Sequence, residues 1–584
     1  MLTVLSIFSL AQIAAPGIPN PVSSPASLIQ TPPPIIQTAV PAADPAAPPT
    51  AVQPARVQPV APPAVPPAGG QPPAVSPLVP PMPPRQIEVV RSQEVRALPG
   101  HLDTVPVFNS NSPELIQSEG ILLSTFPRDV MRVPSAHLNY AFNGRFDLFA
   151  HHVAKGLNPD DTRTLYMGVL VYNPGDQPVT LDILQAVSYL SQDAPFLNLP
   201  AYVANPMGTV FAGPGSRTTT DILRGQRQSQ WPTQVTIPPK RVQLLINMPI
   251  PLRRLTVPTD GTLPPGYLIP APIAPAPAVP AQTTAALVAD ASGMSNTANA
   301  TTDSPPVLPP LINRDIPING RTILMHLSSS GPVYLASLAM YAPQAQGGAE
   351  RVPTLAEWVN LLTQGGLAGP RDRPPSPPDS RRFTRFFYGR VSGVSQGSEW
   401  EAKPTDNPDV DYLSIPQAGQ AISYVISTVD RNTFGTGQIQ SAPMLVRYPD
   451  TAYRAHGNYG VRYNVTLPLL NNTDSTQKVA VMLQTPVQNE QAHNALKFRT
   501  PPDNMVFFRG TIRLRYTTDF GIPQTRYLHL VQRRGQEGEP LLQLTLPKGS
   551  RRLVEVEFVY PPDATPPQVL TIQTIEQRSI ATAN

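Results

Sequence analysis

Proline is the feature that most restricts how this chain can fold, because it occupies 78 of the 584 positions. A proline ring removes a backbone donor and breaks helices, so a mostly helical protein is disfavoured. The prolines are concentrated in two stretches, with 24 in residues 16–84 and 12 in residues 258–310. Both stretches have the composition of hydrated polyproline II segments. We therefore expect a disordered Pro-rich tether over residues 16–85 and a disordered insertion over residues 258–310.

The first fifteen residues, MLTVLSIFSLAQIAA, are apolar and contain no charged side chain. This stretch is too short to span a bilayer, which needs about 20 apolar residues. Residues 1–15 are therefore predicted to be a signal peptide that directs export, with cleavage after Ala11. A disordered apolar N-terminus is the alternative interpretation. No later stretch of the sequence reaches transmembrane length.

Cysteine is absent from the sequence. This excludes disulfides, zinc–thiolate sites and a cysteine nucleophile. Charged residues make up 14% of the chain and the net charge is +4. An exported protein of this charge would meet acidic polysaccharide or lipid headgroups rather than nucleic acid, so we expect no nucleic-acid partner.

Outside the Pro-rich stretches, apolar and polar residues alternate in short runs between turn residues, as in TIRLRYTTDFGIPQTRYLHLVQ. This pattern is typical of β-strands with one buried face. We expect an all-β fold of two tandem β-sandwich units of immunoglobulin-like type, at residues 86–345 and 384–584. In the run LVEVEFVY, the alternation predicts that Glu555 and Glu557 point to solvent.

One short helix is predicted between the two units, within a linker segment at residues 346–383. Thr354 and Glu357 have the spacing of a capping box, which satisfies free N–H groups in the first turn. Gly365 and Gly366 end the apolar run that follows. We interpret this helix as a docking element between the two folded halves.

Three strings of the first unit recur in the same order in the second. SAHLNYAF recurs as RAHGNYGV, VLVYNPGDQPVTLDIL as LPLLNNTDSTQKVAVML, and TIPPKRVQLLI as TLPKGSRRLVEV. The conserved order and nearly constant offset predict a tandem duplication of a β unit. The equivalent positions are His137 and His456, Asn173 and Asn471, and Thr236 and Thr545. Because the histidine recurs in both copies, we favour a packing or hydrogen-bonding role for it over catalysis.

Patterns that would carry catalysis or bind a metal are weak. His151 and His152 are adjacent, and neighbours in a strand point to opposite faces, so they cannot easily share one ion. The string at residues 393–397 matches a nucleophile elbow, but Pro404 follows where that motif needs a helix. The acidic run at residues 406–411 lacks the Gly and the distal Glu of an EF-hand. We predict no catalytic residue, no metal and no cofactor.

Two groups of side chains are candidates for binding. Trp231 and Trp400 lie in polar surroundings, SQWPTQ and GSEWEA, and are candidate stacking platforms for a glycan. The alternative for both is that they fill the edge of a core. The second group is a candidate basic surface, which could bind acidic partners. The alternative is a strand with Arg outside and Phe inside. The residues of the candidate surface are Arg381, Arg382, Arg385, Arg533 and Arg534.

Several long strings resemble the family of domain of unknown function 3370. They are RALPGHLDTVPVFNSNSPELIQSEGILLSTFP, GPGSR at residues 213–217, PTLAEW, GTGQIQSAPMLVRYPDTAYRAHGNYGV and HLVQRRGQEGEP. The resemblance covers roughly residue 86 to the C-terminus, apart from residues 258–310. It implies an exported cyanobacterial protein with a signal and a Pro-rich N-terminal stretch. It implies no activity and assigns no functional residue.

Three functions remain open from the sequence. The first is a non-enzymatic structural or interaction protein of the periplasm or cell envelope, with envelope proteins or cell-wall glycan as partners. The second is a glycan-binding β-sandwich protein that recognises peptidoglycan or exopolysaccharide through its tryptophans. The third, a metal-assisted hydrolase, is disfavoured because no constellation of acid, base and nucleophile is visible.

Overall fold

Strands dominate the part of the chain that the structure describes. The computed structural model describes residues 85–194, 196–252, 316–379, 385–490 and 494–576, and these belong to one compact unit that begins at residue 82. The protein is mostly β, as the sequence predicts, and its strands form several sheets. The predicted signal peptide, the tether up to residue 84 and the predicted insertion at residues 258–310 lie outside the described residues.

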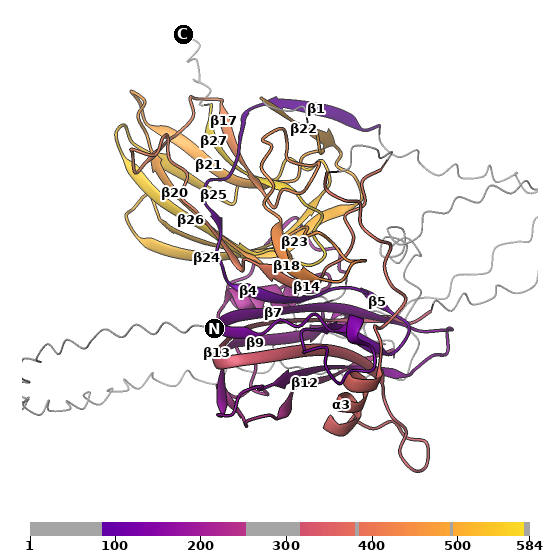
Figure 1. The fold of residues 1–584 in the computed structure, drawn as a ribbon. Helices are drawn as coiled ribbons and strands as arrows, with labels where there is room; N and C mark the ends of the chain where they lie inside the picture. The colour runs from indigo at the N-terminus through magenta and orange to yellow at the C-terminus, as the bar shows by residue number, and fades with distance from the viewer. Residues whose placement is uncertain (1–84, 195, 253–315, 380–384, 491–493, 577–584) are drawn as a thin grey trace, which may run out of the picture. The chain divides into compact units, whose positions relative to one another are not determined.

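The first group of strands is built around the long strand β13 (Ile318–Tyr341) (Figure 1). Its first part pairs with β7 and β9, and its second part pairs with β6 and β8. One strand therefore runs through two sets of strand pairings, which contribute to a single apolar cluster. The other strands of this group are β4 (Pro106–Ser110), β5 (Leu115–Ile116), β6 (Gly120–Ser124), β7 (Phe142–Lys155), β8 (Thr164–Tyr172), β9 (Val179–Leu190), β11 (Gln234–Ile237) and β12 (Val242–Pro251).

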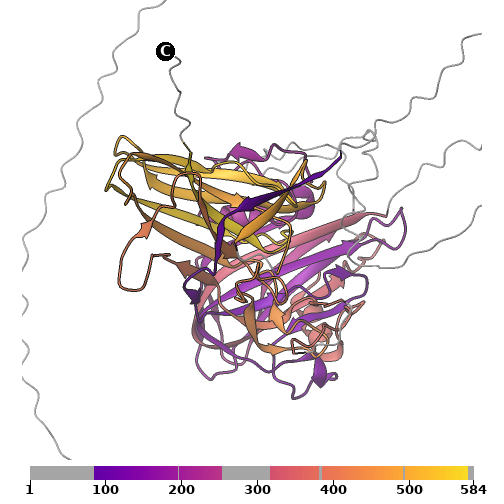
Figure 2. The ribbon, with the colours of Figure 1, turned by 90° about the horizontal axis from the view of Figure 1, so that it is seen from above.

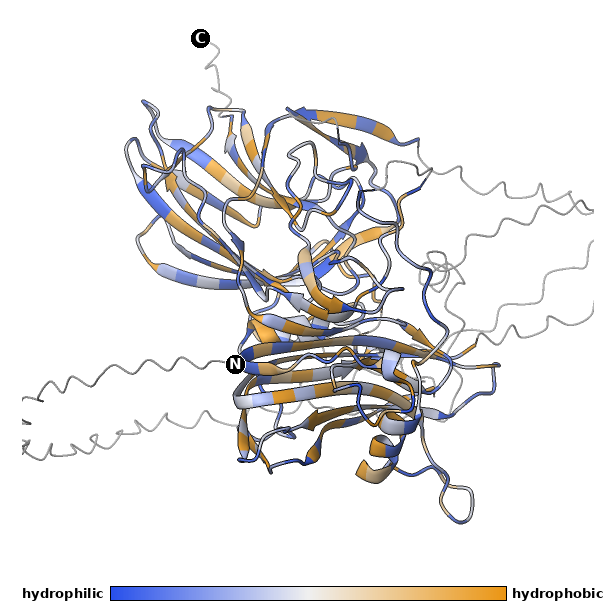
Figure 3. Ribbon diagram, viewed as in Figure 1, coloured by the Kyte–Doolittle hydropathy of each residue, from blue (hydrophilic) through white to orange (hydrophobic). Residues whose placement is uncertain are grey.

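A second apolar cluster lies under the strands of the C-terminal half. Strand β20 (Arg462–Leu470) shows why these residues form strands, since its residues are fully buried at alternate positions. The hydropathy colouring changes between orange and blue along several strands in the same way (Figure 3). One sheet has the order β2 (Glu94–Arg96), β17 (Ala421–Ile426), β27 (Gln568–Ile575), β21 (Gln477–Gln484), β25 (Leu542–Leu546).

The other sheet of this half contains β20 near its centre. Strand β16 (Leu413–Ser414) also pairs with β20, in parallel. The order of the sheet is β10 (Tyr202–Ala204), β24 (Pro523–Arg533), β23 (Val506–Thr517), β26 (Arg551–Val559), β20, β15 (Glu399–Ala402), β3 (His101–Leu102).

Strand pairing crosses the boundaries predicted between the two units. Strand β1 (Ile87–Ser92) pairs with β22 (Ala495–Thr500), and the indigo strand lies beside orange and yellow ones in both views (Figures 1 and 2). In the opposite direction, three later strands extend the sheet of β7 through β4. Residues from both ends of the chain are therefore needed to complete the sheets. The three strands are β14 (Ser392–Gln396), β18 (Ala442–Arg447) and β19 (Arg454–Ala455).

The two strand sets that contain the recurring strings are paired in the same register. In the first set, β11 pairs with β9 so that Ile237 faces Val179, and β12 pairs with β8 so that Val242 faces Tyr172. In the second set, β25 pairs with β21 and β26 with β20. There Leu546 faces Gln477 and Arg551 faces Leu470. The named residues of β8 and β9 lie 298 positions before their counterparts in β20 and β21. The named residues of β11 and β12 lie 309 positions before their counterparts in β25 and β26.

The predicted helix forms as α3 (Leu355–Gln364) with its capping box in place. Glu357 N–H donates to Thr354 Oγ1 at 3.3 Å, and Thr354 N–H donates to Glu357 Oε2 at 2.8 Å. Trp358 and Leu362 are buried and pack with residues of β6, β8 and β13. The helix therefore covers strands of the first group.

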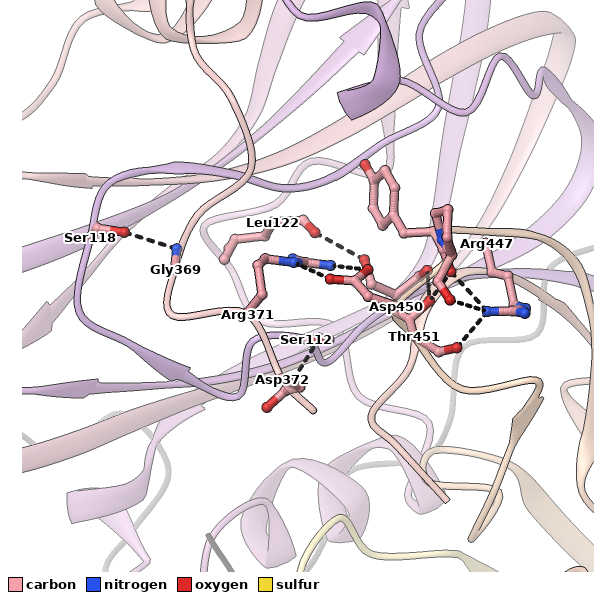
Figure 4. Close-up of polar contacts among 12 residues, drawn as sticks. Ser112, Ser118, Leu122, Gly369, Arg371, Asp372, Arg447, Asp450 and Thr451 are labelled. Atoms are coloured by element: carbon pink, nitrogen blue, oxygen red, sulfur yellow. Dashed lines mark hydrogen bonds and ion pairs between the residues drawn. The ribbon is translucent and has the colours of Figure 1, made fainter. Parts of the chain in front are cut away.

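The segment after α3 has the composition of a linker, yet polar contacts hold it on two sides (Figure 4). Gly369 N–H donates to Ser118 Oγ at 2.9 Å, close to β6. Arg371 forms a two-bond ion pair with Asp450, whose donor–acceptor distances are 2.8 and 2.9 Å. These contacts connect the segment to residues far away in sequence in both directions.

A second helix, α1 (Ser216–Leu223), covers the face of β23 and β26 that was expected to meet solvent. Glu557 is only 2% exposed, so the prediction that it points to solvent is wrong. Its carboxylate accepts from Arg513 Nε at 2.9 Å, and Arg513 also donates to the Leu223 carbonyl at the end of α1. The ion pair compensates for the removal of both charges from water.

Candidate functional site

A cavity of about 300 Å³ lies beside Trp231, at the edge of the first apolar core. The outer wall is formed by residues 243–248 of β12, and the floor by Val171 of β8, Ile183 of β9 and Val235 of β11. None of the residues that line it is ionisable. Its volume lies at the lower end of the range typical of small-molecule sites.

An extra residue in β12 shapes the wall of this cavity. Leu244 faces Leu170, and the next pair along the ladder is Ile246 with Val169, so Leu245 is left over as a bulge. The equivalent ladder of the second strand set runs from Leu553 to Val554 without an interruption. A bulge bends its strand and redirects side chains, and bulges are common beside binding sites.

Trp231 is held at the bulge by a short loop that is fixed along β9. Gln228 N–H donates to the Ala186 carbonyl at 2.9 Å, and its side-chain oxygen accepts from Ser188 N–H at 2.9 Å. Trp231 Nε1 then donates to the carbonyl of the bulged Leu245 at 3.4 Å. The indole is 5% exposed, so only a small part of the ring is open at the cavity.

The polar groups at the cavity are three side-chain amides. Gln243 donates to the Thr236 carbonyl at 3.0 Å, and Asn247 donates to the Pro353 carbonyl at 2.8 Å. Gln230 is exposed and donates to the Gln228 side chain at 2.8 Å. An amide group has an acceptor oxygen and two donor hydrogens, so Gln230 and Gln243 retain capacity beyond these bonds. Asn247 also accepts from Trp358 Nε1 at 3.3 Å, so both ends of its amide are bound beside α3. The cavity thus combines an indole and an apolar floor with neutral hydrogen-bonding groups at its wall.

Trp400, the other predicted glycan contact, lies in the second apolar cluster and is also 5% exposed. Its ring stacks on Tyr463 with 6.4 Å between ring centroids, and Nε1 donates to the Pro99 carbonyl at 3.0 Å. The structure does not bring it near Trp231, because the two belong to different clusters. A glycan contact of Trp400 stays a prediction.

Three of the five arginines of the predicted basic surface, Arg385, Arg533 and Arg534, lie within the described residues. Arg381 and Arg382 lie outside the described residues, and Arg385 is exposed. Arg534 lies 3.5 Å from an Asp503 carboxylate oxygen and above the ring of Phe507. Arg533 ends β24, and its backbone N–H is bound by Gln536 Oε1. A continuous basic surface made by all five stays a prediction.

The adjacent histidines on β7 bind different partners. His151 Nδ1 lies 2.8 Å from Thr322 Oγ1, whereas His152 Nε2 lies 2.9 Å from Ser110 Oγ. His152 Nδ1 must donate to the Pro113 carbonyl, 2.8 Å away, because a carbonyl only accepts. His152 is fully buried, and burial lowers its pKa to about 4. Ser110 is also fully buried, so this Ser–His pair has no access to a substrate.

Other patterns from the sequence are incorporated into ordinary structure. Ser395 of the elbow-like string lies inside strand β14 and is followed by another strand. Within the acidic run, Asp406 binds Ser414 while Asp411 pairs with Arg551. In the described ranges, no three His, Asp or Glu side chains are grouped closely enough to hold a metal ion. No helix of the described part is long and apolar enough to cross a membrane.

Of the recurring histidines, His137 is fully buried and His456 is mostly buried, with 8% of its side chain exposed. His137 Nδ1 lies 2.8 Å from Ser124 Oγ, and His456 packs edge-on against Tyr388 with 4.8 Å between ring centroids. Burial lowers the pKa of His137 to about 4 and that of His456 to about 3. Both are therefore neutral at pH 7 and serve as packing residues with different neighbours.

Comparison with family models identifies one family over most of the chain. The model of the protein family of unknown function DUF3370 matches residues 93–574. The chain belongs to this family. The match covers strands β2 to β27 and includes the Trp231 cavity. No curated protein matches the sequence.

Sequence reasoning identified Trp231 but missed the rest of its site. Leu245, Gln243 and Asn247 were not singled out, although β12 carries a visible signal. The run Leu244–Leu245–Ile246 interrupts the alternation of apolar and polar residues, and the recurring string at residues 545–556 has one residue fewer before the alternation resumes. An interrupted alternation in one of two copies is the sequence signature of a bulge.

Proposed function

We propose that this chain is an exported, non-enzymatic interaction protein of the cyanobacterial periplasm or cell envelope, and that its ligand is an uncharged glycan held at the Trp231 cavity. The observation that carries the proposal is the combination of Trp231 with three amide side chains in a wall that has no ionisable residue. The fold proposed for it is a pair of duplicated β-sandwich units. In support, the β8–β12 and β9–β11 ladders have the same register as the β20–β26 and β21–β25 ladders up to the bulge in β12.

A sugar ring fits this chemistry because it has two kinds of surface. Its C–H groups form an apolar face that stacks on an aromatic ring, and its hydroxyls both donate and accept hydrogen bonds. Gln230 and Gln243 offer both donors and acceptors at the cavity wall. A charged sugar would lose its hydration without gaining an ion pair, which disfavours uronic acids.

Export is proposed from residues 1–15, and the compartment from the resemblance to exported proteins. A role in holding the folded part away from a surface is proposed for the Pro-rich residues 16–85. A metal-assisted hydrolase remains the remote alternative. In the described part of the chain, the Ser–His contact that most resembles catalytic machinery is fully buried at Ser110 and His152.

The test is a calorimetric titration of the full chain with neutral oligosaccharides of the cell wall and with polygalacturonate. We expect neutral sugar to bind and Trp231→Phe to weaken that binding by about tenfold, since the stacking surface is reduced. The matched control is Trp400→Phe, which removes an equally buried indole from the other cluster and should leave affinity unchanged. Absence of binding by every neutral glycan, or equal affinity of the Trp231 variant, would overturn the proposal.

A further inference from the structure

The hairpin of β23 and β24 ends in an apolar tip. Phe520 is 91% exposed and Ile522 is 60% exposed, and both belong to the turn at residues 518–522. All residues from Asp519 to Arg526 are exposed, so no described part of the chain covers the end of the hairpin. An exposed apolar end of this kind is a candidate interaction surface.

Three backbone N–H groups of this turn, those of Thr518, Gly521 and Ile522, are bound within the turn. Thr518 N–H donates to the Ile522 carbonyl at 2.9 Å, and Gly521 N–H donates to the Thr518 carbonyl at 2.9 Å. Ile522 N–H donates to Thr518 Oγ1 at 3.1 Å. A turn whose donors are bound internally can leave water at a low cost, because fewer polar groups lose their hydration unpaired.

The charged side chains near the tip do not cover its apolar end. The carboxylate of Asp519 accepts from Thr545 N–H at 3.0 and 3.1 Å, which fixes it against the edge of β25. Arg515 and Arg526 lie behind the tip on the two strands, and Arg526 is exposed. With a rise of roughly 3.3 Å per residue, Arg526 lies about 13 Å from Ile522 along β24.

Strand register extends the apolar surface from the turn onto the outer face of the sheet. Pro523 faces Thr517 at the base of the turn and is exposed. Tyr516 faces Val554 of β26, so one further step along both strands brings Thr517 beside Leu553, which is 50% exposed. The apolar surface therefore has a protruding end and a shallow continuation.

We propose that this hairpin tip, Phe520 with Ile522, inserts into the interfacial region of a lipid bilayer. A protruding end needs either a matching hollow in a partner or a deformable apolar medium, and the internally bonded turn favours the medium. Tyr516 and Arg526 behind the tip would lie at headgroup level, where amphipathic and cationic side chains are favoured, whereas Arg515 is paired with Glu555. The contact is a weak and reversible anchor, since only two large side chains enter. It is independent of the glycan site.

The absence of cysteine allows a direct test. A Phe520→Cys variant of the full chain, labelled with an environment-sensitive fluorophore, is mixed with vesicles of phosphatidylcholine alone and with added phosphatidylglycerol. We expect a blue shift of emission on both vesicles and a larger bound fraction on the anionic ones. The matched control is labelled Met207→Cys, at a position that is 72% exposed on another loop, and it should show no shift.

Sedimentation with the same vesicles gives the second arm. The double variant Phe520→Ser, Ile522→Ser should bind about tenfold less than the wild type at low salt and at high salt, while Met207→Ser binds as the wild type does. Equal binding of the double variant, or binding that high salt abolishes, would overturn the proposal in favour of charge alone. A label at position 520 that reports an apolar environment without vesicles would show that another segment of this chain covers the tip, and would also overturn it.

Discussion

Asn173 and Asn471 make the same set of hydrogen bonds 298 positions apart in the chain. Asn173 Nδ2 donates to the carbonyls of Gln177 and Ile237, and its Oδ1 accepts from Gly175 N–H. The bonds of Asn471 go to the equivalent positions, Ser475 and Leu546 as acceptors and Thr473 as donor. Each asparagine closes the turn after one strand and ties it to a strand far away in sequence.

Replacing either asparagine should destabilise the protein. Both residues are fully buried, so Asn173→Ala or Asn471→Ala leaves carbonyl groups without their partner in the interior. We expect each change to lower the free energy of unfolding by about 1–3 kcal/mol, measured by urea denaturation. The control is Asn472→Ala, an exposed neighbour whose loss should cost much less. Equal effects at positions 471 and 472 would contradict the structural role.

Deleting the bulged residue tests the origin of the cavity. Without Leu245, β12 would continue from Leu244 to Ile246 as β26 continues from Leu553 to Val554, and every later residue would keep its partner on β8. We expect the deletion variant to fold, with neutral-glycan affinity lowered at least tenfold because the wall moves. Circular dichroism and calorimetry measure the two outcomes. The control is Leu245→Ala, which shortens the same side chain but keeps the extra residue, so the bulge should remain.

The comparison of the deletion with Leu245→Ala separates the bulge from the leucine side chain. The deletion restores an uninterrupted ladder and the substitution does not, so the deletion should lose much more affinity. Retained affinity in the folded deletion variant, or an equal loss in Leu245→Ala, would show that the bulge does not shape the binding site.

The pH dependence of stability should include a contribution from His152. Burial lowers its pKa to about 4, against about 6.5 in an unfolded chain. Between these values the unfolded state binds a proton that the folded state does not, so stability is full above pH 6.5 and falls as the pH falls toward 4. From pH 7 to pH 5 this contribution amounts to about 2 kcal/mol. His152→Gln should reduce the loss by that amount.

The matched control for this titration is His101→Gln, which changes an exposed histidine. Urea unfolding of the three proteins at both pH values gives the comparison. The same loss of stability in the wild type and in His152→Gln would show that His152 does not titrate differently on folding.

Close packing between Gly168 of β8 and Trp358 of α3 should make this glycine sensitive. A Cβ at position 168 would lie 2.7 Å from the indole, which is closer than van der Waals contact. Gly168→Ala should therefore lower the free energy of unfolding by about 1–3 kcal/mol, because the ring or the helix must move. Gly366→Ala is the control, since its Cβ would meet only one atom, 4.0 Å away. Thermal denaturation distinguishes the two variants, and equal melting temperatures would contradict this packing.

Local sequence patterns predicted where helices, strands and turns form better than they predicted which elements pack against one another. The capping box of Thr354 and Glu357 located α3, because cap geometry depends on residues three positions apart. The recurring Asn173 and Asn471 located equivalent turns, because an asparagine side chain bonds to backbone groups close in sequence. The burial of Glu557 was missed, since alternation predicts a face of a strand but cannot tell that α1 covers it.

The candidate site shows the same division. Trp231 was recognised as a candidate from its residue type, but its cavity depends on a bulge in β12 and on a loop fixed along β9. The glycan contact of Trp400 was suggested by the same polar surroundings, yet its ring is stacked on Tyr463. Composition around a tryptophan does not determine its exposure, because residues far away in sequence cover it.

The sequence by itself determined the β class, the ends of α3 and the recurrence of one strand pattern, because these follow from periodicity, turn residues and caps within a few positions of one another. Only the tertiary structure decided that β1 pairs with β22, that α1 covers Glu557 and that Trp231 meets the bulged Leu245. The first two contacts join distant parts of the chain, and the third depends on the bulge that forms when β12 pairs with β8. The free energy of each is gained only when the sheets that hold the partners have formed.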